Sequence, residues 1–198
     1  MSRSTEEKLV RPTDIYMEWK QGQFRYWNKE EKKNIEMPLP VKFLTVDTLS
    51  TIKGWSDSDE SGIWSNEVRD IGKDELIVRT KKGILKQGLY KDIKDAVKNA
   101  GGKYCQSVYI ALIEGETLKL CNIQMMGAAL TSWIEFNKDN DIYSGMISVN
   151  SFIEQGKAIK YKAPVFTGSM VSEELNSKAL DIDTELQKYL TAYFKNDN

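Results

Sequence analysis

Aromatic and basic side chains alternate within one short segment of the chain, Phe24-Arg25-Tyr26-Trp27. Aromatic rings stack on unpaired bases, a contact worth about 1–3 kcal/mol per base, and a guanidinium neutralises a phosphate. Neighbouring side chains of a strand point to opposite faces, so Phe24 and Tyr26 share one face and Arg25 and Trp27 the other. One pair can therefore pack while the other stays available, as a single-stranded nucleic acid would require.

Further residues of these two kinds follow. Trp55 and Trp64 flank a polar loop, and basic residues cluster near residue 80 and near residue 160. The residues that we expect to contact nucleic acid are Arg25, Trp27, Trp55, Trp64, Arg79, Lys81, Lys82, Lys160 and Lys162. A ring in a strand more often belongs to a core, and a lysine cluster is usually a solvated surface. The prediction of nucleic-acid binding therefore depends on the occurrence of aromatic and basic residues together.

The chain contains no histidine. This excludes Ser-His and Cys-His nucleophile pairs, HExxH zinc sites and a histidine base that works at neutral pH. A metal-assisted nuclease would remain open if Asp47, Glu67 and Asp70 converged in a cleft, but these acids are better explained as charges on strand surfaces. We therefore predict a protein that is not an enzyme and that needs no cofactor or metal.

Two segments begin like known ligand loops but do not complete them. Asp57–Gly62 matches the first half of an EF-hand calcium loop, yet Val68 occupies the place of the bidentate glutamate. Gly101-Gly102-Lys103 lacks the preceding glycine and the following Ser or Thr of a phosphate-binding loop. We interpret the first segment as a solvated turn and the second as a helix stop. Cys105 and Cys121 have no CxxC spacing and are expected to be buried.

The composition favours one folded domain without a membrane span. The chain has 198 residues, 40% of them apolar, and its formal net charge is −1. A near-neutral balance argues against a wholly basic coat for duplex DNA, but it allows a local basic groove. No apolar run of about 18 residues occurs, and the first ten residues have no apolar signal-peptide core. With only two cysteines, a reducing cytoplasm is the expected compartment.

Hydrophobic periodicity predicts an alternation of strands and a few helices. Leu89, Ile93 and Val97 recur at helical spacing, whereas the β-branched run that begins at Val41 is typical of a strand. The expected helices are 89–100, 126–137 and 183–194. The expected strands are 23–27 and 35–39 as a hairpin with Pro38 at an edge, then 41–52, 63–68, 76–80, 104–113 and 118–124, and finally a hairpin of 145–153 and 158–165.

The order strand, strand, strand, helix, strand, strand between residues 41 and 124 is that of an OB-fold. The predicted fold is therefore mainly β with added α: an OB-fold-like five-stranded barrel decorated with an N-terminal hairpin, an extra hairpin and helices. Residues 1–13 are expected to be a loose lead-in, and residues 14–165 the barrel domain with its insertions. Residues 166–198 are expected to be a linker, 166–182, followed by an amphipathic C-terminal helix.

Several of these segments also resemble the OB-fold single-stranded-DNA-binding proteins of bacteriophages. The resemblance covers roughly residues 23–165 and rests on QFRYW…EMPLP, KFLTVDTLSTIKGW, SGIWSNEVRD, GLYKDIKDAVKNAGG, KYCQSVYIAL and AALTSWIEF. It implies sequence-independent binding of single strands during phage or mobile-element DNA replication or recombination, in the cytoplasm of a bacterial host. Several such proteins end in an acidic tail, but Tyr193–Asn198 holds one acid and one base. Regulation by such a tail is therefore not expected here.

Single-stranded DNA is thus the expected partner, with RNA, replication proteins and a second copy of the chain as further candidates and no membrane contact. The alternative is a structural or protein-interaction module of a phage or mobile element that binds no nucleic acid. An exposed apolar stripe on helix 183–194, together with no continuous basic groove, would favour that alternative.

Overall fold

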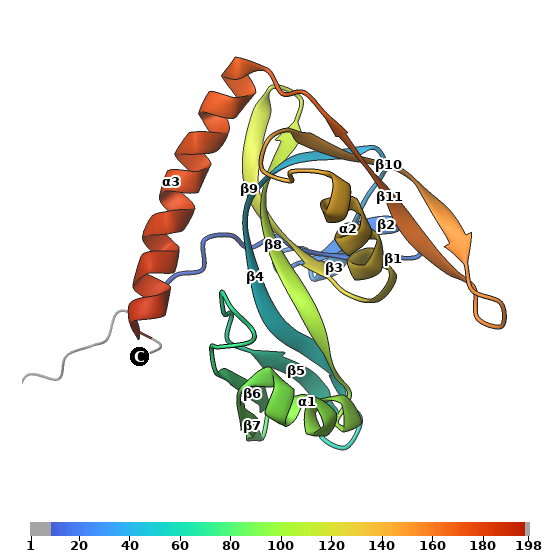
Figure 1. Cartoon of the computed structure of the whole chain (residues 1–198), viewed down its shortest axis with the longest axis vertical. Helices are drawn as coiled ribbons and strands as arrows, with labels where there is room; N and C mark the ends of the chain where they lie inside the picture. The colour runs from blue at the N-terminus through green and yellow to red at the C-terminus, as the bar shows by residue number, and fades with distance from the viewer. Residues whose placement is uncertain (1–8, 197–198) are drawn as a thin grey trace, which may run out of the picture.

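The computed structural model describes residues 9–196, which form a mainly β fold with three helices (Figure 1). The helices are α1 (Tyr90–Asn99), α2 (Gly127–Asp139) and α3 (Glu173–Asn196). The strands are β1 (Tyr16–Lys20), β2 (Gln23–Asn28), β3 (Lys33–Met37), β4 (Val41–Ser56), β5 (Ser61–Ser65), β6 (Leu76–Thr80), β7 (Gly83–Gly88), β8 (Gly102–Glu114), β9 (Thr117–Met125), β10 (Met146–Gln155) and β11 (Tyr161–Ser169).

The strands form one mixed sheet. Its main path runs β3-β2-β1-β9-β8-β4-β5-β6-β7. Off this path, β10 pairs with the first part of β4, and β11 pairs with β10. Neighbouring strands are antiparallel except β1 and β9, which pair in parallel. The prediction of a mainly β fold with added helices is confirmed. Within residues 9–196 no pairing joins the two ends of this path, so the closed OB barrel is not confirmed.

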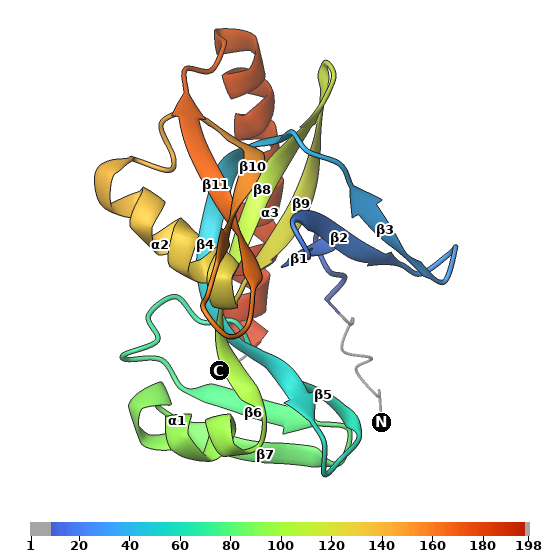
Figure 2. The ribbon, with the colours of Figure 1, turned by 90° about the vertical axis from the view of Figure 1, so that its right-hand side faces the viewer.

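The long strands β4 and β8 connect two lobes, each with its own core (Figure 2). The small lobe contains β5–β7, α1 and the adjoining ends of β4 and β8. Its core includes Ile52, Val78 and Val97. The large lobe contains the other elements, and Phe43 of β4 and Trp133 of α2 belong to its core. Most residues of β4 are buried, including the continuous run Leu49–Ile52, because the strand contributes to both cores and also packs against α3.

Helices α2 and α3 lie on opposite faces of the sheet (Figure 1). Leu186 and Leu190 of α3 pack against Leu49 of β4 and Tyr109 of β8. Because side chains alternate along a strand, Lys53 shares the face of Leu49. We call this the α3 face. The helix covers the large-lobe part of this face and reaches Glu67 after β5, so the part of the face at Trp64 and Arg79 stays open.

Most of the predicted elements are present, and the differences lie at weakly patterned segments. Strands β1 and β7 were not predicted. The strand expected at 63–68 ends at Ser65, and Val68 instead forms an isolated bridge with Ser50. The predicted linker, 166–182, is wrong, because 166–169 belongs to β11 and 173–182 to α3. Of the predicted lead-in, residues 1–8 lie outside the described part of the chain. No helix in that part is long and apolar enough to cross a membrane.

Candidate nucleic-acid interface

A row of directly opposed residues crosses the open part of the α3 face. Lys103 of β8 is opposite Lys53 of β4, which is opposite Trp64 of β5. Trp64 is in turn opposite Arg79 of β6. Directly opposed residues project from the same face with Cβ atoms about 4.5–5.5 Å apart. The row therefore places an indole ring, 40% exposed, between basic side chains.

The basic side chains of this row lack ion-pair partners in the described part of the chain, although the charge of Glu67 acts on Lys53 and partly offsets the effect of burial on its pKa. Lys53, Lys103 and Arg79 form no ion pair with any described residue. Like charges in directly opposed positions destabilise a sheet, and burial holds the pKa of Lys53 below its usual 10.5. A bound anion between Lys53 and Lys103 would relieve both costs.

Two tryptophans from distant strands line one pocket beside this row. In a flat sheet β2 and β5 would lie roughly 24 Å apart, because four strands separate them. The sheet is curved, and Trp27 of β2 and Trp64 of β5 line a single pocket of about 410 Å³ with Lys53. Trp27 is 53% exposed. We call this the tryptophan pocket.

Polar contacts fix the wall of the tryptophan pocket. The Glu67 carboxylate accepts hydrogen bonds from the Ser107 hydroxyl and, at 2.8 Å, from the Tyr109 hydroxyl. Burial raises the pKa of Tyr109 far above its usual value, so this hydroxyl remains a donor. The Glu67 amide donates to the Tyr193 hydroxyl of α3 at 2.8 Å, and Tyr193 also lines the pocket. The acid is therefore directed toward protein hydroxyl groups, and α3 completes the wall.

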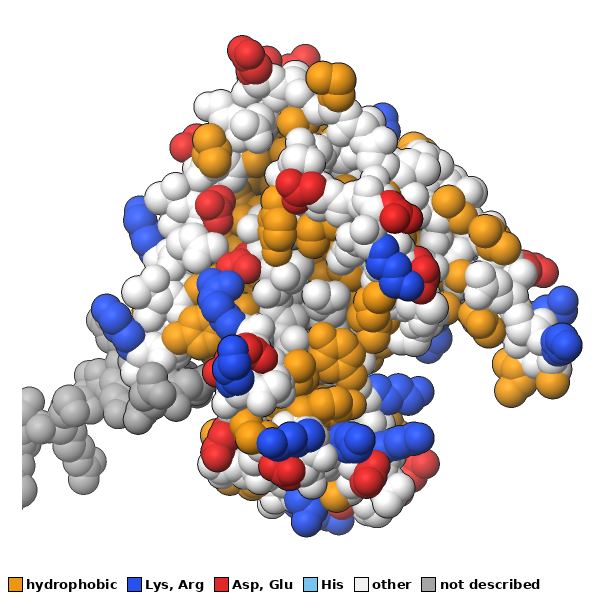
Figure 3. Space-filling view, viewed as in Figure 1, with side chains coloured by type: hydrophobic (Ala, Val, Ile, Leu, Met, Phe, Trp, Pro, Cys, Tyr) orange, Lys and Arg blue, Asp and Glu red, His pale blue; other side chains and the backbone are white. Residues whose placement is uncertain are grey.

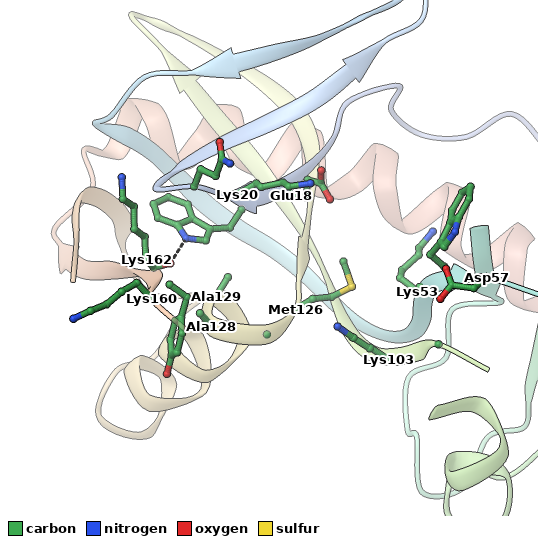
Figure 4. Close-up of a pocket in the computed structure, with 17 residues that line it drawn as sticks. Glu18, Lys20, Lys53, Asp57, Lys103, Met126, Ala128, Ala129, Lys160 and Lys162 are labelled. Atoms are coloured by element: carbon green, nitrogen blue, oxygen red, sulfur yellow. Dashed lines mark hydrogen bonds between the residues drawn. The ribbon is translucent and has the colours of Figure 1, made fainter. Parts of the chain in front are cut away.

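A second hollow of about 1180 Å³ lies between the two lobes (Figure 4). The end of β4, the β1–β2 turn, the first turn of α2 and the β10–β11 hairpin surround it. It contains five lysines and two acids: Lys20, Lys53, Lys103, Lys160, Lys162, Glu18 and Asp57. Trp55 lines it and is 57% exposed. We call this hollow the lysine groove. The first turn of α2, which lines the groove, contains no acidic residue. The partial positive charge at the N-terminus of this helix is therefore not compensated within that turn.

The two hollows meet at Lys53. Among the described residues, this side chain alone lines both. Lys53 and Trp55 are two positions apart in β4, so their side chains project from the same face of the strand. A chain of alternating phosphates and bases would thus find basic groups and exposed rings along one path from Trp55 to Trp27.

Glycines allow the small lobe to pack closely enough to place Trp55 and Lys103. Gly101 follows α1 with a φ of +98°, and a Cβ there would lie 2.1 Å from the carbonyl oxygen of Trp55. A Cβ on Gly54 would lie 2.2 Å from the carbonyl oxygen of Gly101. The predicted role of the diglycine as a helix stop is confirmed, and the close approach of Gly101 to β4 explains why Gly101 and Gly54 are both glycine.

Of the predicted contact residues, the structure brings five into the two hollows. Trp27 and Trp64 line the tryptophan pocket, and Trp55, Lys160 and Lys162 line the lysine groove. Lys162 also lies 4.4 Å from the centre of the Phe152 ring, and its carbonyl accepts a 2.7 Å hydrogen bond from the Trp19 indole.

The other four predicted residues line neither hollow within the described structure. Arg79 lies in the row opposite Trp64. Arg25 forms a 2.6 Å ion pair with Glu18. Lys81 donates to the Glu60 carbonyl at 3.3 Å, and Lys82 pairs with Asp59 at 2.8 Å. The two lysines of the β6–β7 turn are thus engaged with the turn between β4 and β5.

Sequence reasoning missed Lys53 and Lys103, the central cations of the site. The strand was predicted over 41–52 with its end near Gly54, and no face was assigned to Lys53 at this end. A signal was present, because Lys53 and Trp55 alternate with Gly54 in a strand whose preceding residues are β-branched. A strand extended to Trp55 would have placed both side chains on one face.

The three acids considered for nuclease chemistry do not converge. Asp47 accepts hydrogen bonds from Arg69 at 2.9 and 3.0 Å, Glu67 faces Ser107, and Asp70 pairs with Lys73. In residues 9–196 no group of three or more Cys, Asp or Glu side chains is placed to hold a metal ion. The segment 57–62 forms the turn between β4 and β5 and enters β5, in agreement with its interpretation as a turn.

Comparisons of the chain with protein families, with curated proteins and with solved structures found no match. A function for this chain must therefore be inferred from the side chains of the two hollows and their chemistry.

Proposed function

We propose that this protein binds single-stranded DNA without sequence preference, in phage or mobile-element replication or recombination in the bacterial cytoplasm. The observation that carries the proposal is the arrangement of Trp27 and Trp64 around one pocket that also contains Lys53, a cation without an ion-pair partner among the described residues. Rings of this kind stack on bases, and lysines neutralise the phosphates between them.

Single strands suit these hollows better than duplex DNA. In a duplex the base faces are hidden within the stack, so tryptophans that line a pocket cannot reach them. A single strand exposes base faces and phosphates at the same time. Every base has a ring face, so stacking does not select a sequence. The lysine groove supplies a local positive charge although the chain as a whole carries −1.

The alternative, a protein-interaction module, has less support. An exposed apolar stripe on the C-terminal helix would have favoured this alternative. In α3 the side chains of Leu186 and Leu190 are instead fully buried against Leu49 and Tyr109. The helix thus uses its apolar face inside the molecule.

The proposal is tested by titrating an oligo-dT strand into the protein while intrinsic tryptophan fluorescence is recorded at low and at high salt. We expect saturable quenching that salt reverses, because bound phosphates release counterions. Trp27→Ala and Trp64→Ala should each weaken binding about 5- to 150-fold, the equivalent of one stacked base. Tyr143→Ala, which removes an exposed ring outside both hollows, should leave binding unchanged.

An absence of both quenching and a gel mobility shift with oligo-dT would refute the proposal. Parallel titration with oligo-rU measures the preference between DNA and RNA. Equal losses in the Tyr143→Ala control and in the two tryptophan variants would show that the tryptophans act only through stability.

A further inference from the structure

The β10–β11 hairpin extends beyond the sheet (Figure 1). β10 pairs with β4 only from Met146 to Val149, and from Ser151 to Gln155 it pairs with β11 alone. All side chains from 151 to 161 are exposed. The end of the hairpin is thus free of contacts with the sheet core.

The hairpin end combines aliphatic and basic side chains. Ile153 is 55% exposed and Ile159 is 80% exposed. Lys157 and Lys160 flank Ile159, and Glu154 is the only acid between residues 150 and 162. Apolar and basic side chains lie together at this tip in Figure 3, at the right-hand edge of the molecule. Apolar side chains that lie together on an exposed surface are typical of interaction sites.

Contacts at the base of the hairpin hold it in place. The Trp19 indole donates to the Lys162 carbonyl, and the Lys162 ammonium lies over the Phe152 ring. A Cβ on Gly22 of the β1–β2 turn would lie 2.8 Å from both Lys162 and Phe152, so the turn packs tightly against the hairpin. A two-stranded hairpin alone is only marginally stable in water. These contacts therefore fix the direction in which the tip projects.

The tip stands at one end of the lysine groove. Lys160, Tyr161 and Lys162 line the groove, so a strand bound there passes beside the tip as it enters or leaves. The exposed apolar side chains of the two hollows are aromatic, whereas those at the hairpin tip include two isoleucines. Rings serve as platforms for single bases, whereas aliphatic side chains act in other DNA-binding proteins as wedges against base steps.

We propose that the hairpin tip engages the end of a duplex at the point where the bound single strand joins double-stranded DNA. Ile159 wedges between the last base pair and the first unpaired base and unstacks them, and Lys157 and Lys160 contact the phosphates on either side. This inference rests on the proposed function. The positive charge of the tip and its continuity with the lysine groove identify DNA as the occupant, in preference to a second copy of the chain.

The test compares three DNA probes: oligo-dT, a blunt duplex, and duplexes with a 5′ or a 3′ oligo-dT tail. The last base pair before the tail contains 2-aminopurine, whose fluorescence rises when it unstacks. We expect one tailed duplex to bind about tenfold more tightly than oligo-dT of the same tail length, the factor supplied by burial of one isoleucine side chain. Its 2-aminopurine signal should rise on binding.

Ile159→Ser should remove the preference for the tailed duplex and the rise of the 2-aminopurine signal, while oligo-dT affinity stays unchanged. The matched control is Ile84→Ser, which replaces an isoleucine that is 56% exposed on β7 and lines neither hollow in the described structure. This variant should behave like the parent protein.

The outcomes separate this inference from the function on which it rests. Tight oligo-dT binding without a tailed-duplex preference, or with a preference that survives Ile159→Ser, overturns the role of the tip and leaves single-strand binding intact. A loss of self-association in Ile159→Ser, seen by sedimentation, with no change on the tailed duplex, assigns the tip to contacts between copies and also overturns it. No binding to oligo-dT refutes the proposed function itself.

Discussion

Lys53→Met is expected to weaken DNA binding without weakening the fold. Methionine keeps the unbranched apolar stem and removes the charge. In the free protein that charge opposes folding, because Lys53 is directly opposite Lys103 and burial lowers its pKa. In the complex the same charge lies where the two hollows meet. Binding and stability should therefore change in opposite directions.

The size of the binding effect follows from counterion release. One phosphate neutralised on a single strand adds about 0.7 to the slope of log K against log salt concentration. The affinity of Lys53→Met should thus be lower than that of the parent by about eightfold at ~50 mM salt and by about threefold at ~200 mM. Relief of the repulsion between Lys53 and Lys103 should raise the free energy of unfolding by about 0.2–1 kcal/mol.

The pH dependence of stability gives an independent check. The folded-state pKa of Lys53 lies below 10.5, so the unfolded chain binds this proton more tightly. In the parent protein the free energy of unfolding should therefore rise with pH between the lowered pKa and 10.5, as far as this group is concerned. Lys53→Met should lack that contribution.

Fluorescence titrations of oligo-dT at several salt concentrations and urea denaturation measure these effects. Lys82→Met is the matched control, because Lys82 pairs with Asp59 and lines neither hollow in the described structure. It should keep the parent's salt slope and change stability by at most about 1 kcal/mol. An unchanged slope in Lys53→Met, or a loss of stability, would refute the reasoning.

Three further changes test how the site is held. Leu190→Ala should cost about 2–5 kcal/mol in urea denaturation and weaken oligo-dT binding, because the α3 contact loses a buried side chain. Burial alone would raise the pKa of Asp47, but hydrogen bonds from its arginine and glutamine partners hold it below 3.8. Stability measured by thermal melts should therefore fall as pH drops below 3.8 through that pKa, and Asp47→Asn should remove this dependence. Gly101→Ala should cost more unfolding free energy than Gly115→Ala, since both have positive φ but only the first Cβ would clash, 2.1 Å from the Trp55 carbonyl oxygen. Equal losses in the two glycine variants would contradict the packing argument.

Local patterns in the sequence were sufficient for the hairpins and for α1, whose apolar residues recur at helical spacing. They were insufficient where pairing is remote or the segment is polar. β1 has only five residues. Its turn into β2 at Gln21-Gly22 is short, and its parallel pairing with β9 joins segments far apart in the sequence, so the local pattern did not reveal the strand. β7 lies at the end of the sheet with most of its residues exposed, which leaves little alternation to read. The first part of α3 is mostly exposed and has few apolar residues, so it resembled a linker.

The site could be predicted by residue type but not by arrangement. Trp27 and Trp64 were chosen as isolated rings, and only the curvature of the whole sheet brings them to one pocket. Lys82 looked as available as Lys160. Its charge is used by Asp59, and that pairing depends on two turns that meet only in the folded chain. Lys53 was missed because it stands near the predicted end of its strand, where no face was assigned to the side chains.

The parallel pairing of β1 with β9 has a consequence for synthesis on the ribosome. Met17 lies opposite Ile123, so the strand that covers β1 emerges roughly 100 residues later, about 5–20 s at ~5–20 residues per second. During this delay Met17 and Phe24, both fully buried in the finished protein, have no partner in β9. Contacts of such long sequence separation form late. The apolar side chains of the nascent N-terminal strands are therefore exposed to aggregation during this interval, in which a chaperone would protect them.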